Sequence, residues 1–589
     1  MTKKQKLELT WVGKENRPRL EPRILLEDPE KSYHAAHRVG DEDIFDNRLI
    51  FGDNLLALKA LEQEFSGRIK CIYIDPPFNT QQAFDHYEDG LEHSVWLSLM
   101  RDRIELLHRL MAPDGTLFVH IDDNEIGYLI VLIDEIFGRQ NRISVVTFKQ
   151  GAATGHKAIN PGVVSTSNFI LIYAKDKSSW LPKRVFTGRP DRDRRYGQFI
   201  VNSGSEFSNW KFSTLASAFA THLGLPERGL KKALGDEYEN QITEFVQKNP
   251  NKVVRLARPD YKSVSQDARD MIDHSKRHPN SVHLLKRNGF SPMYFVRGER
   301  ILFYVDKLKE IDGELVAGEP LTTIWDDLLS NNLHNEGEVS FPKGKKPEML
   351  IKRCLELCTE PNDWVLDSFA GSGTIGATAH KMRRRWIMIE LQDHCNTHIV
   401  PRLQRVVQGV DLSGVSKATS WQGGGGFRYF RLAPSLLETD KWGREVISKA
   451  YNAEMLAEAL CKIEGFTYAP SDAVYWQHGH STERDFIYVT TQTLGVEQLQ
   501  QLSEEVGSER SLLVLCSAFR GSADRWPNLT VKKIPNHIRS RCEWGHDDYS
   551  LNVENLPKAP PRLEPEVPSA ARVDAGQPDL FGAKNGGSR

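Results

Sequence analysis

The sequence predicts an α/β protein built on a Rossmann-like, doubly wound sheet, with one inserted domain and a C-terminal α/β accessory domain. Three observations predict this fold class. Short apolar runs alternate with amphipathic helical segments in two stretches, 46–175 and 331–432. A glycine-rich turn directly follows one of these runs, and a long basic stretch without the alternation separates the two. Strands that alternate with helices are typical of a parallel sheet with helices on both faces.

The first stretch opens with a strand, a turn and a helix in RLIFGDNLLALKAL, which begins at residue 48. IKCIYI at 69–74 is apolar and rich in β-branched residues, which indicates a buried strand. A helix is expected over 93–111, and the turn sequence APDG at 112–115 ends it. The elements expected next are a strand at 116–121, a helix at 124–138 and strands at 142–148 and 168–175.

The second stretch repeats this alternation after the basic region. Its expected elements are a helix at 346–358, a strand at 363–367, a helix at 373–385, a strand at 386–390 and a helix at 392–407. Residues 1–45 are expected to form a polar arm. Residues 433–555 are expected to form a small α/β domain, with strands in DFIYVTT and RSLLVLCSAF. Residues 556–589 are rich in Pro, Ala and Gly, which indicates a disordered tail.

The composition fits a soluble globular protein, with 39% hydrophobic and 26% charged residues. The apolar runs are shorter than the roughly 18–20 residues of a membrane span, and the basic N-terminus lacks the apolar block of a signal peptide. Seven cysteines at irregular positions fit reduced, buried thiols. We therefore expect a cytoplasmic protein without a membrane partner. The net charge of −2 does not by itself indicate a nucleic-acid partner.

The glycine-rich turn lies in WVLDSFAGSGTIG, which begins at residue 364. Gly371, Gly373 and Gly376 match the G-x-G-x-x-G pattern, in which backbone amides approach a ligand at a helix N-terminus. Glu390 ends the next strand, where an acid can hold a ribose. NAD, FAD and S-adenosylmethionine all fit this pattern. Asp367 stands directly before the turn and favours S-adenosylmethionine, because a carboxylate there can pair with the ammonium group of that cofactor.

A second motif, DPPF at 75–78, follows the strand IKCIYI. Open α/β sheets bind their ligands at the carboxyl ends of strands. Asp75 supplies one acceptor, and Pro77 fixes the bend so that the carbonyl of Pro76 can serve as a second. Phe78 offers a flat face for stacking. Two acceptors beside an aromatic ring predict a site for a planar heterocycle with an exocyclic amino group, such as adenine.

The two motifs together resemble those of the DNA amino-methyltransferases of the β order, in which DPPF precedes, here by about 290 residues, a turn such as DSFAGSGT. FGDNLLALKAL, FPKGKKPEMLIKRCLEL and GGGGFRYFRL are further similar segments, the last resembling the Mod subunits of Type III restriction-modification systems. The resemblance implies site-specific methyl transfer from S-adenosylmethionine to N6 of a flipped-out adenine in duplex DNA. It also implies a place in a restriction-modification or phage-defence system. The alternative is methylation of N4 of cytosine.

The resemblance also implies a set of site residues and no metal. Asp75, Pro76, Pro77 and Phe78 would form the base pocket. The cofactor-binding residues would be Asp367, Phe369, Ala370, Gly371, Gly373, Thr374 and Glu390, with Asp53 and Asn54 at the cofactor adenine and Lys346 with Pro347 near its methionine end. HIDDNE at 120–125 could suggest a metal site, but we interpret it as the strand beside the catalytic one.

The partners implied are double-stranded DNA, a helicase or nuclease (restriction) subunit and a second copy of the chain. The basic insert at 176–330 lies where this family carries its target-recognition domain, and residues 433–555 would dock the helicase or nuclease. QPDLF, from Gln577 to Phe581, resembles a peptide that binds the replication sliding clamp. Two other classes of protein fit the sequence less well. An oxidoreductase would leave DPPF unexplained, and a non-catalytic scaffold would not need every predicted catalytic residue.

Overall fold

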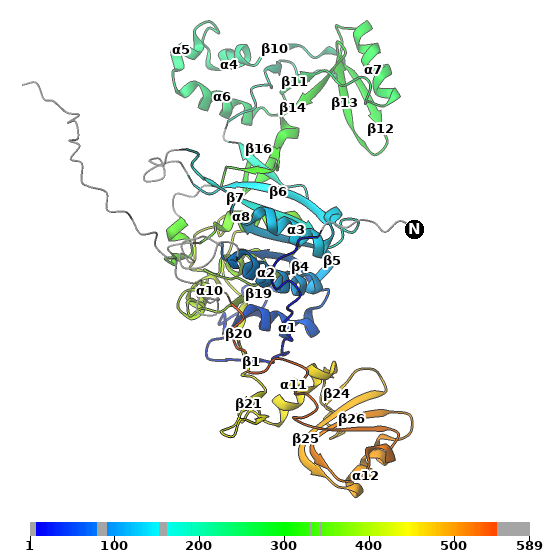
Figure 1. Cartoon of the computed structure of the whole chain (residues 1–589). Coiled ribbons are helices and arrows are strands. Elements are labelled where there is room, and N and C mark those ends of the chain that lie inside the picture. The colour runs from blue at the N-terminus through cyan, green and yellow to red at the C-terminus, as the bar shows by residue number, and fades with distance from the viewer. Residues whose placement is uncertain are drawn as a thin grey trace, which may run out of the picture.

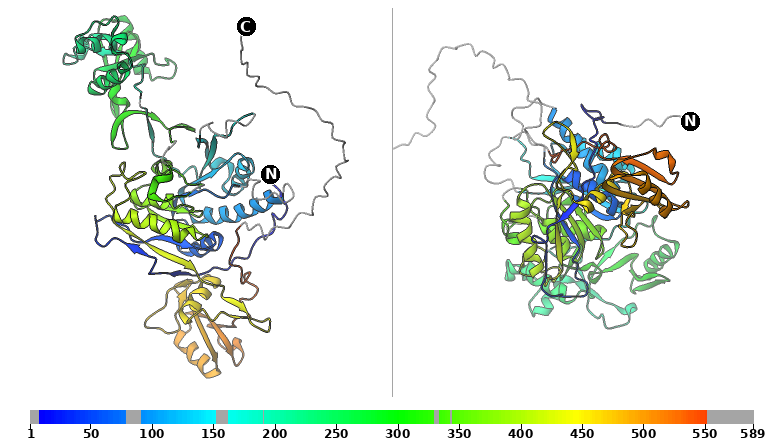
Figure 2. Two further views of the ribbon diagram at one scale, coloured as in Figure 1. Left: turned by 90° about the vertical axis from the view of Figure 1, so that its left-hand side faces the viewer. Right: turned by 90° about the horizontal axis from the view of Figure 1, so that it is seen from below.

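The computed structural model describes residues 8–78, 91–151, 162–189, 191–328, 333–341 and 344–550. They form an elongated molecule of three bodies (Figure 1). A central α/β body lies between a lobe from the middle of the sequence and a smaller C-terminal unit, and a view from the side keeps these two at opposite ends (Figure 2). Within the described residues, no helix combines the length and apolar character needed to cross a membrane.

An eleven-stranded sheet forms the central body, in the order β1-β20-β3-β19-β18-β4-β5-β7-β6-β17, with β2 also paired to β20. Its strands are β1 (Leu25–Glu27), β2 (Tyr33–His34), β3 (Asn47–Phe51), β4 (Ile69–Ile74), β5 (Met111–Ile121), β6 (Arg142–Lys149), β7 (Ser167–Ala174), β17 (Ile324–Trp325), β18 (Trp364–Asp367), β19 (Arg385–Glu390) and β20 (Gly426–Leu432). The strands from β20 to β5 are parallel, as predicted. β7 is antiparallel to both β5 and β6, so the sheet is mixed rather than wholly parallel.

Helices cover both faces of this sheet, which confirms the doubly wound α/β class. The helices of the central body are α1 (Asn54–Phe65), α2 (Leu91–Leu110), α3 (Ile126–Phe137), α8 (Glu348–Cys358), α9 (Thr374–Lys381) and α10 (Val400–Gln408). α1, α2 and α3 pack in one hydrophobic core, and α8, α9 and α10 pack in the other. β4 serves both cores, because Ile72 and Ile74 face the first and Cys71 and Tyr73 face the second.

Two predicted elements of the central body differ in detail from the structure. The turn APDG lies inside β5, where the pairing with β4 jumps from Ile69–Met111 to Cys71–Thr116. The chain therefore bulges at 112–115 and then continues in the same strand. The helix predicted at 392–407 begins as a π-helical turn, Cys395–Ile399, before α10.

The middle of the sequence forms the lobe, which is built on two sheets of its own. A six-stranded sheet has the order β10-β9-β11-β14-β13-β12, and a three-stranded sheet has the order β15-β16-β8. The strands are β8 (Phe186–Arg189), β9 (Gln198–Ile200), β10 (Phe212–Thr214), β11 (Val253–Ala257), β12 (His283–Arg287), β13 (Phe290–Val296), β14 (Glu299–Phe303), β15 (Leu308–Ile311) and β16 (Glu314–Pro320). The helices are α4 (Leu215–Leu223), α5 (Leu230–Leu234), α6 (Glu237–Lys248) and α7 (Gln266–Arg277). β17 then returns the chain to the central sheet beside β6.

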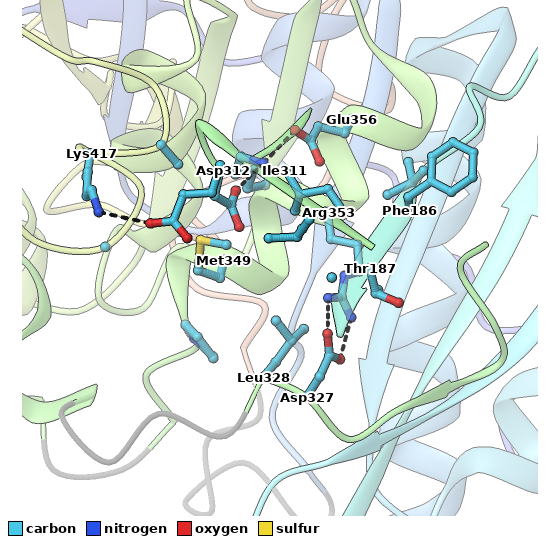
Figure 3. A pocket seen from close by; sticks show the side chains of 18 of the residues that line it. Phe186, Thr187, Ile311, Asp312, Asp327, Leu328, Met349, Arg353, Glu356 and Lys417 are labelled. Atoms are coloured by element: carbon cyan, nitrogen blue, oxygen red, sulfur yellow. Dashed lines mark hydrogen bonds and ion pairs between the residues drawn. The ribbon is translucent and has the colours of Figure 1, made fainter. Parts of the chain in front are cut away.

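A cavity of about 1010 Å³ lies where the three-stranded sheet of the lobe meets α8 (Figure 3). Ion pairs join the two sides, with Lys352 Nζ 3.0 Å from Asp312 Oδ1 and Lys417 Nζ 3.5 Å from Glu314 Oε1. Most of the charged side chains that line this cavity are therefore paired with one another. This cavity marks the joint between the lobe and the body and contains neither of the two predicted motifs.

The C-terminal unit contains β21 (Leu437–Thr439), β22 (Glu445–Ile447), α11 (Ala453–Glu464), β23 (Thr467–Tyr468), β24 (Gly479–His480), β25 (Asp485–Leu494), α12 (Val496–Val506), β26 (Ser511–Phe519) and β27 (Leu529–Lys533). β25, β26 and β27 are parallel, so this is a small α/β unit with strands in the two predicted segments. The N-terminal segment joins it to the central body, because β1 and β2 pair with β20 while Ile24 is buried in the C-terminal core.

Candidate active site at the carboxyl ends of the central strands

A cavity of about 530 Å³ lies at the carboxyl ends of β3, β4, β18 and β19, the adjacent parallel strands near the middle of the sheet. The predicted site residues that line it are Asn54, Asp75, Pro76, Pro77, Phe78, Lys346, Phe369, Gly371 and Glu390. The two sequence motifs therefore meet in one place, because β4 and β18 are hydrogen-bonded neighbours. This edge of an open α/β sheet is where ligands bind.

The DPPF segment, residues 75–78, directly follows β4 and forms a corner of the chain. Lys346 donates from its ammonium group to Asp75 Oδ2. Asp75 Oδ1 is buried and accepts no hydrogen bond from any residue in the described part of the chain. Burial raises the pKa of Asp75, and the charge of Lys346 opposes that rise. The corner is fixed by Trp96 of α2, whose Nε1–H donates to the carbonyl of Pro77 at 2.9 Å.

The ring of Phe78 is supported from within the protein. His120 lies parallel to it, with 6.2 Å between ring centroids and 20° between the planes. The two nitrogens of His120 contact the Tyr73 hydroxyl (2.9 Å) and the Asn168 amide (3.0 Å), and burial lowers the pKa of His120 well below its usual value. His120 is thus a neutral, fully bonded core residue. No group of three or more His, Cys, Asp or Glu side chains suited to a metal ion occurs in the described ranges.

The glycine turn connects β18 to α9. Asp367 Oδ1 accepts a hydrogen bond from Phe369 N–H at 2.9 Å, whereas Oδ2 is buried and has no partner among the described residues. Burial, and then the nearby charges of Asp75 and Glu390, raise the pKa of Asp367 well above its usual value. Gly371 has φ +53° and donates its N–H to Glu390 Oε2 at 2.8 Å. Three carboxylates thus lie close together around this end of the cavity.

The remaining residues of the predicted turn lie beneath the cavity surface. Ala370 is buried in the core beside α8, and Thr374 Oγ1 accepts a hydrogen bond from buried Arg402 at 3.0 Å. Gly373 has φ +75°, and a Cβ there would lie 2.9 Å from Cγ2 of Ile399. These three residues shape the turn and do not line the cavity.

Asp53 and Lys346 have surroundings that the sequence did not indicate. Asp53 Oδ1 caps α1 by accepting the N–H groups of residues 55 and 56. Its Oδ2 accepts Tyr549 N–H at 3.0 Å and lies 3.5 Å from Arg103 Nη2, so both oxygens are occupied and only Asn54 reaches the cavity. Lys346 was expected near the methionine end of a cofactor, and the structure places its ammonium on the Asp75 carboxylate.

Several further residues line the cavity without having been predicted. They are Trp96, Leu99 and Arg103 from α2, Phe341 and Gly344 before α8, Ser368, Ile389, Leu391, Gln392 and His394 around the end of β19, and Ser550 near the end of the described chain. An arginine within the apolar periodicity of α2 was a possible signal for Arg103, which is 2% exposed. Ser550 had no local signal, because only the tertiary fold brings it to the cavity.

Comparisons with known proteins match this arrangement. The model of the DNA methylase family N6_N4_Mtase matches residues 69–400, which include both motifs. The HindVI Mod subunit of Haemophilus influenzae, a probable type III restriction-modification enzyme, is 32% identical over 460 residues, 74% of this chain and 60% of that protein. The type III EcoP15I Mod subunit of Escherichia coli is 24% identical over 447 residues, 65% of this chain and 63% of that protein.

The type II methyltransferase M.EcaI of Enterobacter cloacae is 25% identical over 368 residues, 59% of this chain and 67% of that protein. The chain spans about three fifths of the length of the two Mod subunits. TTHA0409 of Thermus thermophilus, solved with S-adenosyl-L-methionine, covers 65% of this chain and 99% of its own at 13% identity, and its TM-score of 0.31 is too low for a detailed comparison. The family match extends over more than half of the chain and includes both motifs, so the chain belongs to the N6/N4 DNA methylase family.

Proposed function

We propose that this chain transfers a methyl group from S-adenosylmethionine to N6 of an adenine flipped out of duplex DNA. One observation carries the proposal. Two buried carboxylate oxygens, Asp75 Oδ1 and Asp367 Oδ2, lack partners among the described residues and stand at the ends of neighbouring strands. Asp75 lines the cavity, and Asp367, which does not, directly precedes Ser368 and Phe369, which do. A buried acceptor without a donor is costly, so each is suited to a donor that arrives with a ligand.

The residues around Asp367 fit S-adenosylmethionine. A ligand ammonium beside Asp367 would relieve the mutual repulsion of Asp367, Asp75 and Glu390, which raises the pKa of Asp367. Glu390 lies where a ribose can be held, and the glycine at 371 leaves room for close approach, because a Cβ there would meet only the carbonyl oxygen of Phe369, at 3.8 Å. When bound, S-adenosylmethionine supplies a methyl group on a sulfonium, which is an excellent leaving group.

The DPPF corner would orient the adenine. Asp75 Oδ1 accepts one N–H of the exocyclic amino group, the carbonyl of Pro76 is the second acceptor, and Phe78 stacks on the ring. These hydrogen bonds favour a pyramidal nitrogen whose lone pair is free for the methyl group, so positioning and charge lower the barrier. Lys346 donates to Asp75 Oδ2, and its charge opposes the rise that burial causes in the pKa of Asp75, which favours the ionised form that accepts hydrogen bonds.

The choice of adenine rests on the aspartate that opens DPPF, since the family as a whole includes N6 and N4 methylation. Cytosine N4 is the second candidate. The same cavity could hold either base, because both carry an amino group on a flat ring. Extrusion of either base from a duplex costs a few kcal/mol, which the remaining protein–DNA contacts must supply.

We assign DNA recognition to the lobe, with the hairpin of β12 and β13 as the element that enters the major groove. A two-stranded ribbon fits that groove. At the tip of the hairpin Lys286 is exposed, Phe290 is 65% exposed and Arg287 lies 4.7 Å from the ring of Phe290. This tip offers cations for phosphates or guanine edges beside an aromatic side chain.

The partners proposed follow the relatives, two of which are Mod subunits of type III restriction-modification enzymes. We propose a restriction (helicase or nuclease) subunit docked on the C-terminal unit, a homodimer, and action on DNA in the cytoplasm. Binding of the sliding clamp through QPDLF is a further proposal, and Gln577–Phe581 lie outside the described residues.

Nucleoside analysis tests the function. Purified chain is incubated with unmethylated genomic DNA and S-adenosylmethionine labelled on its methyl group, and the DNA is digested to nucleosides. We expect the label in N6-methyladenine and none with Asp75→Ala. Label in N4-methylcytosine would establish the second candidate, and no label in DNA of any sequence, with cofactor bound, would refute the proposal.

A further inference from the structure

The last eight described residues, 543–550, return from the C-terminal unit to the central body, and we call them the clasp. Their first part crosses the N-terminal segment. Glu543 N–H donates to the carbonyl of Arg19 (2.8 Å), and Arg23 donates from Nη2 to the carbonyl of His546 (3.0 Å) and to Asp547 Oδ1 (2.7 Å). Arg23 is 2% exposed, so the clasp is anchored on a buried group.

The end of the clasp reaches α1 and α2 at the edge of the active-site cavity. Tyr549 N–H donates to Asp53 Oδ2 at 3.0 Å, and the carbonyl of Tyr549 accepts a hydrogen bond from Arg103 Nη2 at 3.2 Å. Arg103 also donates from Nε to Asn54 Oδ1, and Asn54 lines the cavity. Through its backbone the clasp therefore contacts Arg103, which lines this edge of the cavity, and Asp53, which caps the helix that carries Asn54.

The clasp is also a partition between two cavities. Leu99, Arg103 and Ser550 line both the active-site cavity of about 530 Å³ and a second cavity of about 620 Å³. The second cavity lies on the side of the N-terminal segment and is also lined by Tyr549. Tyr549 and Ser550 therefore stand at the boundary between the active-site cavity and the second cavity.

We propose that the clasp completes the cofactor pocket, so that docking of the C-terminal unit sets the affinity of the central body for S-adenosylmethionine. This inference rests on the function proposed above. Exclusion of water strengthens charged contacts inside the cavity, because the local dielectric falls. Tyr549 acts as a positioning residue through Asp53 and Arg103. The C-terminal unit thereby gains a role in cofactor binding that does not require a bound partner.

Two shortened chains test the clasp. One ends at Ser550 and the other at Asp547, so they differ only in residues 548–550, and both keep the anchors on Arg23. We expect the chain ending at Ser550 to bind S-adenosylmethionine as the full chain does in isothermal titration calorimetry. The chain ending at Asp547 should bind about tenfold more weakly, as for loss of a hydrogen bond to a charged group. KM for the cofactor should rise in parallel, with kcat at saturating cofactor within about twofold.

A second variant, Tyr549→Pro in the full chain, removes the N–H that Asp53 accepts without shortening the chain, and should also raise the dissociation constant. Thermal melting of each variant in the absence of cofactor reports folding separately. Equal affinities of the two shortened chains, or a fall in kcat with an unchanged KM, would overturn the role of the clasp. If the full chain itself fails to bind S-adenosylmethionine, the proposed function is refuted instead.

Discussion

Asp367→Asn should stabilise the protein and weaken its binding of cofactor. In the folded chain Asp367 is fully buried, one oxygen has no partner among the described residues, and its pKa is raised well above the usual value. Asparagine keeps an oxygen for Phe369 N–H and removes the buried charge. The substitution relieves the desolvation of the carboxylate and its repulsion by Asp75 and Glu390, although the new NH2 group is itself buried, so we expect a net gain of about 1 kcal/mol. For a unit of this size that is a rise of roughly 2 °C in Tm.

The direction of this pKa shift determines how the stabilisation by Asp367→Asn depends on pH. A raised pKa means that the folded state holds the proton of Asp367 where the unfolded state has lost it, so wild-type stability falls as pH rises through that interval. The advantage of Asp367→Asn should therefore be largest above the raised pKa and disappear toward the ordinary aspartate pKa. Tm measured from pH 4 to pH 9 without cofactor tests this.

In contrast to its stabilising effect, Asp367→Asn should lower the affinity for S-adenosylmethionine. A hydrogen bond to a charged group contributes about 2 kcal/mol, so loss of the contact between Asp367 and the ammonium corresponds to roughly a thirtyfold higher dissociation constant in calorimetry. Asp363→Asn is the matched control, because Asp363 directly precedes the same strand at its opposite end and its carboxylate accepts the N–H of Glu360. A destabilised Asp367→Asn protein with unchanged affinity would show that Asp367 is structural, and would refute the assignment.

Two further substitutions separate the two halves of the site. Asp75→Ala should lower methyl transfer at least 100-fold, measured with labelled cofactor, while the dissociation constant of S-adenosylmethionine changes less than about threefold, because the proposed contact of Asp75 is with the base and not with the cofactor. Full turnover on duplex DNA would contradict the mechanism. Gly371→Val should raise that dissociation constant tenfold or more, since Gly371 lines the cavity with φ +53° and a Cβ there would meet only the carbonyl oxygen of Phe369, at 3.8 Å, which leaves the valine side chain in the space of the ligand. Unchanged cofactor affinity with lost transfer would contradict the placement of the glycine turn.

The sequence by itself determined the local elements and the two motifs. β4 was evident because IKCIYI is apolar apart from Lys70, as expected for a strand buried on both faces. Asp75 and Asp367 were identified because Asp75 directly follows one such strand and Asp367 ends another, and strand ends in parallel sheets meet at one edge. The strands and the motifs at their ends depend on residues close together in the sequence, so apolar periodicity and turn-forming residues are enough to predict them.

Only the tertiary structure decided which partners these groups have. The antiparallel direction of β7 is set by its pairing with β5 and β6, which no local pattern encodes. The ammonium of Lys346 on Asp75 and the backbone of Tyr549 on Asp53 join residues hundreds of positions apart. Such contacts arise when the whole chain packs, because a backbone amide or a lysine can pair with any carboxylate that the fold brings near. The sequence therefore defined the chemistry of the site, and the packing of distant segments determined which carboxylates remain available to a ligand.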